Sequence, residues 1–413
     1  MFGRGAGAGG GAIRSVLPQD ETIVRLGGVG DGYKMTWTAD DRQLMPVNDG
    51  SGWSRHPTAF YNSRLWSVTG GPREATFEEV TGYPDLNNFR RSDEAPRYYG
   101  HGILAVKGRL YQFLGTLDRA TDRPRHWTGA KLIYSDDGGR SWCNQDGSSP
   151  VIWEDWDGQT GKRLLFFREP QGSFSLICLL QMGRAYSGNR DGYVYGYSPN
   201  GSLDGQMNQL VMFRVPAGRM LDRAAYEFFA GTQGGRARWV PDIIDRAPVH
   251  VFPRGWVNRT NLFSGDLVVE SWLPSVVYNE ALDIYLMACA GIGCAADGTE
   301  FGKPSYLGFW VSSTPWGPWR QVHEESAWTP GNDREARAYA PQIAPKWLAA
   351  DGRSFWLVWA DLQGIRDFVR DRSVLAAQLQ AAQGPRAKSA VIAEFHRRYL
   401  PRYAFNAQRV RLL

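Results

Sequence analysis

The sequence predicts an all-β protein, built from many short strands joined by turns and long loops. Two features of its composition carry this prediction. Aromatic residues make up 13% of the 413 positions, and 48 glycines and 23 prolines supply residues that favour turns. With a mean hydropathy of −0.40 and only 22% charged residues, the chain is too apolar and aromatic to be disordered. It contains no apolar run of the roughly 18 residues that a membrane-spanning helix needs.

Short strand-like runs recur along the chain, and three pairs of them have the pattern of a hairpin. Lys107-Gly108 separates two alternating runs, Asp351-Gly352 separates two more, and Asn279–Asp283 forms the turn of a third pair. Helical patterns are scarce; the candidates are Arg219–Ala230, Arg372–Gln383 and residues 385–397. We therefore expect strands throughout, with a few short helices.

One motif indicates how the hairpins are arranged. Residues 135–142, SDDGGRSW, match S-x-D-x-G-x-[ST]-W, a tight turn called an Asp box. Its Asp caps backbone N–H groups, its glycines take positive φ, and its Trp packs on the sheet, so the motif is structural. Residues 312–319, SSTPWGPW, repeat the spacing of the Ser and the Trp. Repeated hairpins of this kind are typical of β-propellers, and the chain length suits about five blades.

No linker divides the chain, so we expect a single propeller domain over residues 21–413. Residues 1–20 are expected to form a flexible, Gly-rich leader. Residues 403–413 alternate like a strand, and we expect this last strand to close the ring by completing a blade near residues 22–50.

Several segments together resemble domain-of-unknown-function family 4185, whose members are similar to arabinan-degrading glycoside hydrolases. The matching segments are residues 36–50, 98–111, 134–142, 188–198, 225–239, 270–287, 312–319 and 339–359. The resemblance spans most of the chain. It implies a five-bladed β-propeller and activity on a furanoside-containing polysaccharide such as a cell-wall arabinan.

Glycoside hydrolysis needs two carboxyl groups on either side of the scissile bond. The first candidates are Asp40, Asp41 and Asp49, because residues 36–50 have the pattern of strand, acidic turn, strand and acidic turn. The resemblance places an acidic residue on the inner strand of the first blade, and Asp40 or Asp41 matches it in order. The alternative is that Asp40 and Asp41 are ordinary turn residues.

Two further carboxyl groups complete the candidate set. Asp191 precedes a Tyr-rich strand, and Glu270 precedes Ser271-Trp272, where it would act as the proton donor. Glu227 is a rival for which a surface position on a short helix is the preferred interpretation. Sugar rings stack on aromatic faces while charged groups bind their hydroxyls. On these grounds the candidate substrate-binding residues are Trp53, His101, Arg190, Tyr193 and Trp272.

Other chemistries find little support in the sequence. Six histidines without paired spacing argue against a zinc site, so no cofactor is expected, with a calcium ion in the central channel as the alternative. Serine-nucleophile and phosphate-loop motifs are absent.

Cys289 and Cys294 are expected to be buried thiols, with a disulfide between them as the alternative. The net charge of +5 is spread thinly, which does not favour nucleic-acid binding.

The sequence therefore predicts a glycoside-hydrolase-like propeller that acts on a polysaccharide. The alternative is a non-catalytic glycan-binding or structural protein, such as a surface-layer, phage-tail or adhesion subunit, which could form a homo-oligomer or a larger assembly. No secretory signal pattern is seen at residues 1–15. Two locations therefore stay open. The protein acts outside the cell or at its surface, by an export route that the sequence does not show, or it acts in the cytoplasm.

Overall fold

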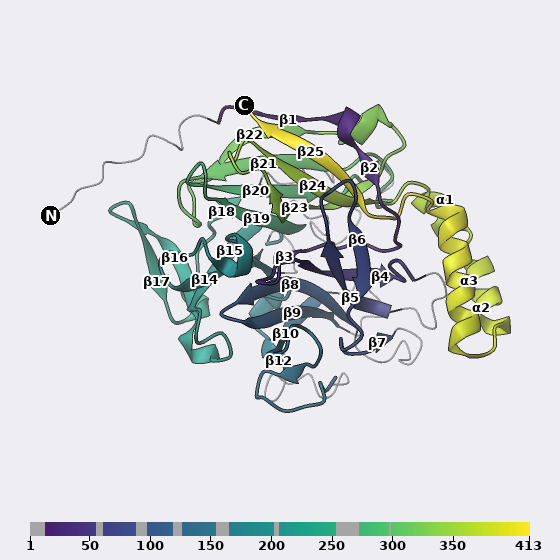
Figure 1. Cartoon of the computed structure of the whole chain (residues 1–413), viewed down its shortest axis with the longest axis horizontal. Helices are drawn as coiled ribbons and strands as arrows, with labels where there is room; N and C mark the ends of the chain where they lie inside the picture. The colour runs from purple at the N-terminus through teal and green to yellow at the C-terminus, as the bar shows by residue number, and fades with distance from the viewer. Residues whose placement is uncertain are drawn as a thin grey trace.

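The molecule is a five-bladed β-propeller, as predicted (Figure 1). The computed structural model describes residues 13–54, 61–87, 97–118, 126–153, 165–201, 206–252, 272–296 and 299–413. Each blade is an antiparallel sheet, and the inner strands around the propeller axis are β3 (Thr36–Trp37), β8 (Tyr98–Val106), β13 (Cys178–Leu179), β19 (Trp272–Asn279) and β23 (Ala338–Leu348). Three short α-helices and six 3-10 turns are the helical elements of these residues.

Blades 1 to 3 follow one another in sequence. Blade 1 contains β3 (Thr36–Trp37), β4 (Gln43–Gly50), β5 (Tyr61–Thr69) and β6 (Thr76–Glu79), with β7 (Leu86–Asn87) paired to β5. Blade 2 contains β8 (Tyr98–Val106), β9 (Arg109–Leu117), β10 (Trp127–Ser135) and β11 (Cys143–Asn144), with β12 (Leu165–Phe167) paired to β10. Blade 3 contains β13 (Cys178–Leu179), β14 (Tyr193–Pro199), β15 (Gln209–Pro216), β16 (Glu227–Gln233) and β17 (Arg236–Val240), with β18 (His250–Val251) paired to β15.

Blade 4 is the simplest sheet and blade 5 joins the two ends of the chain. Blade 4 contains β19 (Trp272–Asn279), β20 (Ile284–Gly291), β21 (Tyr306–Ser312) and β22 (Arg320–Glu325). Blade 5 contains β23 (Ala338–Leu348), β24 (Ser354–Asp361), β25 (Asn406–Leu412) and β1 (Val16–Pro18), with β2 (Val24–Arg25) also paired to β25. The 3-10 turns are Asp20–Thr22, Pro170–Gly172, Arg184–Tyr186, Arg223–Ala225, Ile243–Asp245 and Pro330–Asn332.

The C-terminal strand closes the ring, and the beginning of the span expected to pair with it does so, because Val24 and Arg25 of β2 lie opposite Ala407 and Asn406. β25 lies between β24 and β1, with Val16 opposite Leu412, so the purple start and the yellow end of the chain lie side by side (Figure 1). The blade that it completes is therefore blade 5, and residues 36–50 belong to blade 1. Because Val16–Pro18 pair with β25 and Ile13 is buried, these residues are part of the sheet and not of a flexible leader.

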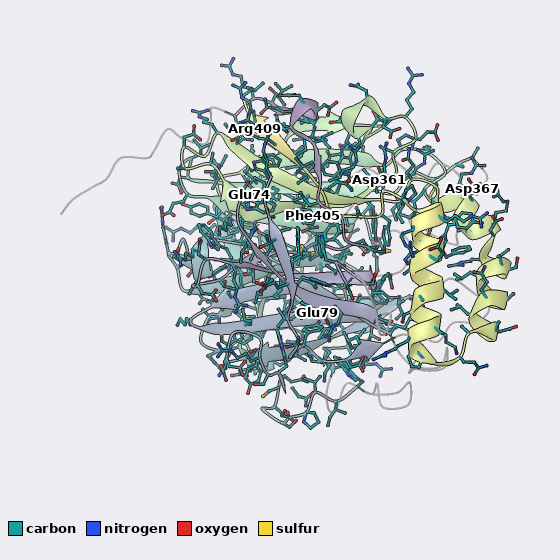
Figure 2. All side chains as sticks on the ribbon, turned by 45° about the vertical axis from the view of Figure 1, so that its right-hand side comes forward. Glu74, Glu79, Asp361, Asp367, Phe405 and Arg409 are labelled. Atoms are coloured by element: carbon teal, nitrogen blue, oxygen red, sulfur yellow. The ribbon has the colours of Figure 1, made fainter. Side chains whose placement is uncertain are left out.

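The helices form one insertion between β24 and β25. They are α1 (Ile365–Arg370), α2 (Arg372–Ala381) and α3 (Gly384–Tyr399), and they stand beside the propeller with Asp361 near their base (Figure 2). The sequence pattern predicted the last two helices well. The helix expected at Arg219–Ala230 is wrong: Phe228 lies in β16 opposite Phe213 and Val240, where strand pairing outweighs a weak helical preference. No helix in the described ranges is long and apolar enough to cross a membrane.

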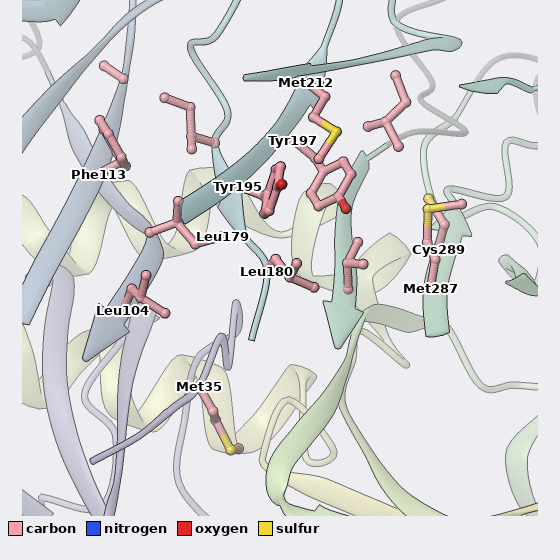
Figure 3. Packing of buried hydrophobic residues seen from close by; sticks show 14 of the residues in the cluster. Met35, Leu104, Phe113, Leu179, Leu180, Tyr195, Tyr197, Met212, Met287 and Cys289 are labelled. Atoms are coloured by element: carbon pink, nitrogen blue, oxygen red, sulfur yellow. The ribbon is translucent and has the colours of Figure 1, made fainter. Parts of the chain in front are cut away.

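Apolar side chains from neighbouring blades meet between the sheets. Figure 3 shows Leu104 of β8, Leu179 of β13, Met287 of β20 and Met35, which precedes β3, as members of one cluster of buried apolar side chains. Cys289 and Cys294 are buried thiols, and no disulfide joins any of the four cysteines, which all lie in the described ranges. Together with three smaller clusters of buried apolar residues, this packing holds the blades against one another and fixes the inner strands around the axis.

Hydrogen bonds also join the inner strands from blade to blade. Gly102 N donates to Ile177 O (2.7 Å) between blades 2 and 3, and Gln181 N donates to Val276 O (3.0 Å) between blades 3 and 4. Ile343 N donates to Ser275 Oγ (2.9 Å) between blades 4 and 5. We call the end at which the inner strands begin the entry end (Asp31, Tyr98, Trp272 and Ala338). We call the end at which they turn the hairpin end (residues 38–42, 107–108, 280–283 and 349–353).

Candidate active site

Two carboxyl groups meet at the entry end of blade 1. Asp31 lies just before the inner strand, and its backbone forms a bridge with Asn48 of β4 (N–O distances of 3.0 and 2.9 Å). That bridge brings the next residue of β4, Asp49, close to Asp31. Asp49 has a φ of 49°, in the left-handed region. Its side chain therefore departs from the pattern in which successive strand residues point to opposite faces of the sheet. The pairing register therefore creates the carboxyl pair.

The surroundings of this pair favour the protonated form of both groups. Burial raises the pKa of Asp31 well above its usual range, against the effect of a hydrogen bond from Tyr403. Burial also raises the pKa of Asp49, which the negative charge of Asp31 raises further and the positive charge of Arg97 lowers. Two neighbouring carboxyl groups in a poorly solvated site cannot both ionise easily, so one of them keeps its proton near neutral pH.

Aromatic hydroxyls and a cation surround the pair. Tyr403 donates to Asp31 Oδ2 (2.7 Å), and Tyr33 donates to Gly30 O (2.7 Å). Burial and the charge of Asp49 raise the pKa of Tyr99, and the charge of Arg97 lowers it. Arg97, Tyr99 and the two carboxyl groups therefore share one electrostatic environment. Such a group of polar side chains can bind a polar substrate and move a proton.

His101 lies two residues beyond Tyr99 on β8 and is almost fully buried, with 3% of its surface exposed. Neither ring nitrogen has a hydrogen-bond partner among the described residues. The ring makes an edge contact with Trp127 at 5.4 Å between centroids. Burial and the charge of Lys34 lower the pKa of His101 to about 3, so the imidazole is neutral. Its role in substrate binding stays a prediction.

Asp40 and Asp41 lie at the hairpin end, separated from Asp49 by the eight-residue strand β4, which is roughly 25 Å long at 3.3 Å per residue. Partial burial raises the pKa of Asp40, but hydrogen bonds from Thr38 and Arg42 and the Arg42 charge hold it below its usual value. Hydrogen bonds from Lys346 and Trp37 lower the pKa of Asp41. The three residues expected to act together therefore do not meet.

This turn has a clear structural role. Lys346 Nζ of blade 5 lies 3.0 Å from Asp41 Oδ2, and Arg42 Nη2 donates to Gly138 O of blade 2 at 3.0 Å. Arg184 of blade 3 donates to Ala39 O through Nε (3.0 Å) and Nη2 (2.5 Å). The acidic turn thus ties together the hairpin ends of four blades, and low pKa values suit such contacts better than proton donation.

Asp191, Arg190 and Tyr193 also lie at the hairpin end. Asp191 accepts hydrogen bonds from the Asn189 amide (3.0 Å), the Tyr193 backbone (3.0 Å) and the Tyr195 hydroxyl (2.5 Å), so it organises its own turn. Arg190 lies over the ring of Tyr278. The structure therefore separates these residues from Asp31 and Asp49, and their assigned roles stay predictions.

The guanidinium of Arg214 lies between two rings at this end, 4.3 Å from the centroid of Tyr193 and 4.6 Å from that of Trp239. The rival carboxylate, Glu227, binds the same guanidinium (Nε–Oε2 2.6 Å) on strand β16 and not on a surface helix. One face of Tyr193 is therefore already covered by Arg214.

Trp53 follows β4 at the entry end but is packed into blade 1. Its ring stacks on Phe77 with centroids 3.7 Å apart and planes at 6°, and its Nε1 donates to Leu26 O (2.7 Å). A Cβ at Gly28 would lie 2.8 Å from the same ring, so that side has no room for a sugar. Glu270 lies outside the described residues. Trp272 begins β19 at the entry end, and its side chain is likewise outside the description.

Sequence reasoning missed Asp31, Arg97, Tyr99 and Tyr403. The signal for Asp31 is a single acidic residue between Gly30 and Gly32, directly ahead of the first inner strand. Tyr403 carries no signal of its own, because its contact depends on how the end of the chain returns to its beginning.

The oxygens at the axis do not suit a calcium ion. The carbonyl oxygens of Leu273 and Pro274 and the side-chain oxygen of Gln342 face the axis, and all three accept hydrogen bonds from Lys34 Nζ. Calcium takes six to eight oxygen ligands, several of them usually carboxylates. In the part of the chain that the structure describes, no three His, Cys, Asp or Glu side chains gather as a metal site would require.

No protein-family model matches the chain, and no curated protein matches it in sequence. Among solved structures, a Bacteroides ovatus protein assigned as a hydrolase matches with a TM-score of 0.52 and 15% identity. The match covers 94% of this chain and 87% of that one. At this identity the likeness shows a shared fold.

Two further solved structures show weaker matches. One is a family 43 glycoside hydrolase of a Bacteroides ovatus xyloglucan locus, with a TM-score of 0.45 and 12% identity over 83% of this chain and 51% of that one. The other is the catalytic domain of a family 62 α-L-arabinofuranosidase of Coprinopsis cinerea, with a TM-score of 0.41 and 10% identity over 82% and 89%. The five-bladed propeller fold itself follows from the sheet topology of this chain.

Proposed function

We propose that this chain hydrolyses a glycosidic bond in a polysaccharide, with Asp31 and Asp49 at its reaction centre. The observation that carries the proposal is the pair of electrostatically coupled carboxyl groups at the entry end, both with raised pKa. Glycoside hydrolysis needs a carboxyl group that holds a proton and a carboxylate that attacks the sugar or activates water. A pair that shares one negative charge near neutral pH provides both forms.

Asp31 is the better candidate for the basic role. The hydrogen bond from Tyr403 stabilises its ionised form and fixes the orientation of the carboxylate. Asp49 is the member whose pKa the neighbouring charge raises further, so it holds the proton of the pair. Burial raises the pKa of Asp31, which makes its carboxylate a stronger base for a water molecule. Glu270 stays the predicted donor to the leaving group, and its position lies outside the described residues.

The substrate class in this proposal is a furanoside-containing polysaccharide, with arabinan as the first compound to test. The support is the resemblance of the segments between residues 36 and 359 to domain-of-unknown-function family 4185, together with the glycoside-hydrolase-like fold. Arg97 and Tyr99 beside the carboxyl pair supply the donors that sugar hydroxyls require. A binding protein without catalysis would need aromatic and Arg side chains but no coupled carboxyl pair.

The test is hydrolysis of a panel of arabinan, arabinoxylan, xylan and galactan by the wild-type chain and by single Asp→Asn variants. Asp31→Asn is expected to lower kcat about 1,000-fold, as expected for loss of a general base. Asp40→Asn, Asp41→Asn and Asp191→Asn are expected to stay within about threefold of wild type, because these residues lie at the hairpin end. Asp245→Asn, in a 3-10 turn of blade 3, serves as a matched surface control.

Two results would contradict the proposal. If wild-type protein with an intact thermal transition releases no reducing sugar from any member of the panel, the chain is not a hydrolase of these substrates. If Asp40→Asn or Asp191→Asn abolishes hydrolysis while Asp31→Asn does not, the reaction centre lies at the hairpin end.

A further inference from the structure

The axis of the propeller contains a buried amine. Lys34 comes from the inner segment of blade 1, and only 5% of its surface is exposed. Its Nζ donates to Leu273 O (3.2 Å) and Pro274 O (3.4 Å) of blade 4 and to Gln342 Oε1 (3.3 Å) of blade 5. It lines an axial cavity of about 20 Å³, which has room for a single water molecule.

A buried ammonium group needs strong compensation, because removing a charge from water is costly. The three oxygen partners of Lys34 are neutral, and no salt bridge to it is found among the described residues. The charge at the axis is therefore balanced by dipoles, in the way that rings of carbonyl oxygens balance a bound cation. An ammonium group with three N–H donors matches the three acceptor oxygens in number.

All five blades contribute to the wall of this cavity. Its other members are Met35, Gly102, Ile103, Cys178, Leu179, Gln181, Pro274, Ser275, Val276, Gln342 and Ile343. The side chains that could take a cation there are amides, a hydroxyl and a thiol. Burial raises the pKa of Cys178, while the charge of Lys34 and a hydrogen bond from it act in the opposite direction. The thiol of Cys178 is thus a further partner of the Lys34 ammonium group, beside the three oxygens.

We propose that the ammonium group of Lys34 is the permanent cation of the propeller axis, in place of a bound metal ion. It joins the inner segment of blade 1 to blades 4 and 5 and places a fixed positive charge beside His101. Because the cation is part of the chain, fold and activity need no added metal. Lys34 is a positioning residue in this arrangement: it acts on the axis and on His101 and does not touch the reacting atoms.

The first test uses the wild-type chain with and without a chelator. Excess EDTA is expected to leave the melting temperature within 1 °C of its value without chelator, and added Ca²⁺ is expected not to raise it. A fall of several degrees with EDTA that Ca²⁺ reverses would overturn the proposal. This test needs no variant and therefore does not depend on whether a substitution folds.

The second test removes the charge. Lys34→Met keeps most of the side-chain volume and is expected to lower the melting temperature by about 5 °C or more, because three buried oxygens lose their donor. Gln342→Met removes a single acceptor and is expected to have a smaller effect. Lys107→Met, in the exposed β8–β9 turn, is the matched control and is expected to shift the transition by less than 1 °C. A Lys34→Met protein as stable as the control would overturn the proposal.

The third test distinguishes a cation from a merely well-packed side chain. Lys34→Ala is expected to recover part of its lost stability in 0.5 M methylammonium chloride but not in 0.5 M tetramethylammonium chloride, which has no N–H donor. In Lys34→Met, the pKa of the His101 imidazole, followed by histidine NMR, is expected to rise relative to wild type. Equal recovery in both salts, or an unchanged His101 titration, would contradict the role of the charge.

Discussion

The hydroxyl of Tyr403 donates a hydrogen bond of 2.7 Å to the carboxylate of Asp31, although 372 positions separate the two residues in sequence. Tyr403 lies between α3 and β25, on the segment that returns to close blade 5. Asp31 opens blade 1. When the end of the chain closes the ring, it therefore also brings Tyr403 to Asp31 and completes the candidate active site.

Tyr403→Phe should shift the pH dependence of hydrolysis. In the wild-type protein the hydrogen bond from Tyr403 lowers the pKa of Asp31. The phenylalanine of the variant cannot make this bond, so the pKa of Asp31 rises further in the variant. If Asp31 acts as the ionised base, the acidic limb of kcat/KM moves to higher pH, and activity at pH 6 falls about tenfold. Profiles from pH 4 to 9 would measure this shift. Tyr285→Phe, at the hairpin end, is the control, and identical profiles for both variants would contradict the assignment.

Asp49→Asn should stabilise the fold, and increasingly so as the pH rises. A carboxyl group whose pKa is raised by folding contributes stability below its unfolded pKa of about 4, and this contribution is lost as the pH rises through the folded value. The amide has no such loss. We expect the melting temperature of Asp49→Asn to exceed that of wild type by about 2 °C or more at pH 8 and by less at pH 5. A constant difference across this range would show that Asp49 is not perturbed.

Asp137→Ala should affect stability and not catalysis. Asp137 accepts hydrogen bonds from Ser135 Oγ (2.8 Å), Ser141 N (2.9 Å) and Ser141 Oγ (2.6 Å) in the turn between β10 and β11. The turn also holds Trp142 in the core of blade 2. Because Asp137 is exposed, we expect a loss of only about 1–2 kcal/mol in unfolding free energy. Denaturant titration and kcat measurements would check this, and a large loss of kcat would contradict the structural role.

Deletion of residues 400–413 should abolish cooperative folding. β25 is an interior strand of blade 5, so its removal breaks the ladders to β24, β1 and β2 and exposes the core that Phe405 and Val410 fill. Calorimetry is expected to show no single sharp transition for the truncated chain. A truncated protein that melts as sharply as the full chain would show that the ring does not depend on this strand.

The turns were predictable from the sequence because their chemistry is local. Lys107-Gly108 and Asp351-Gly352 form hairpins as predicted, and the glycines take the positive φ that such turns need. The helices over residues 372–381 and 384–399 were found for the same reason. The expected helix at Arg219–Ala230 failed because Phe228 and Phe229 are buried by pairing with strands distant in sequence.

The site was harder to predict because it depends on which end of the propeller each turn occupies. Asp40 and Asp49 are nine positions apart, yet an intervening strand places them at opposite ends of blade 1. A turn Asp and a site Asp have the same appearance in a sequence. Two features of the folded chain distinguish the site Asp from the turn Asp. One is the direction of β4, and the other is the hydrogen bond that Tyr403 makes when the end of the chain closes the ring.

The central position of β25 in blade 5 also has a consequence for biosynthesis. Its residue Leu412 pairs with Val16, although almost the whole described chain lies between them. The ribosome must therefore translate β25 before the fifth sheet can form, and until then the four earlier sheets wait with exposed edges. In the cell, this interval is when the protein is most open to aggregation and to chaperones.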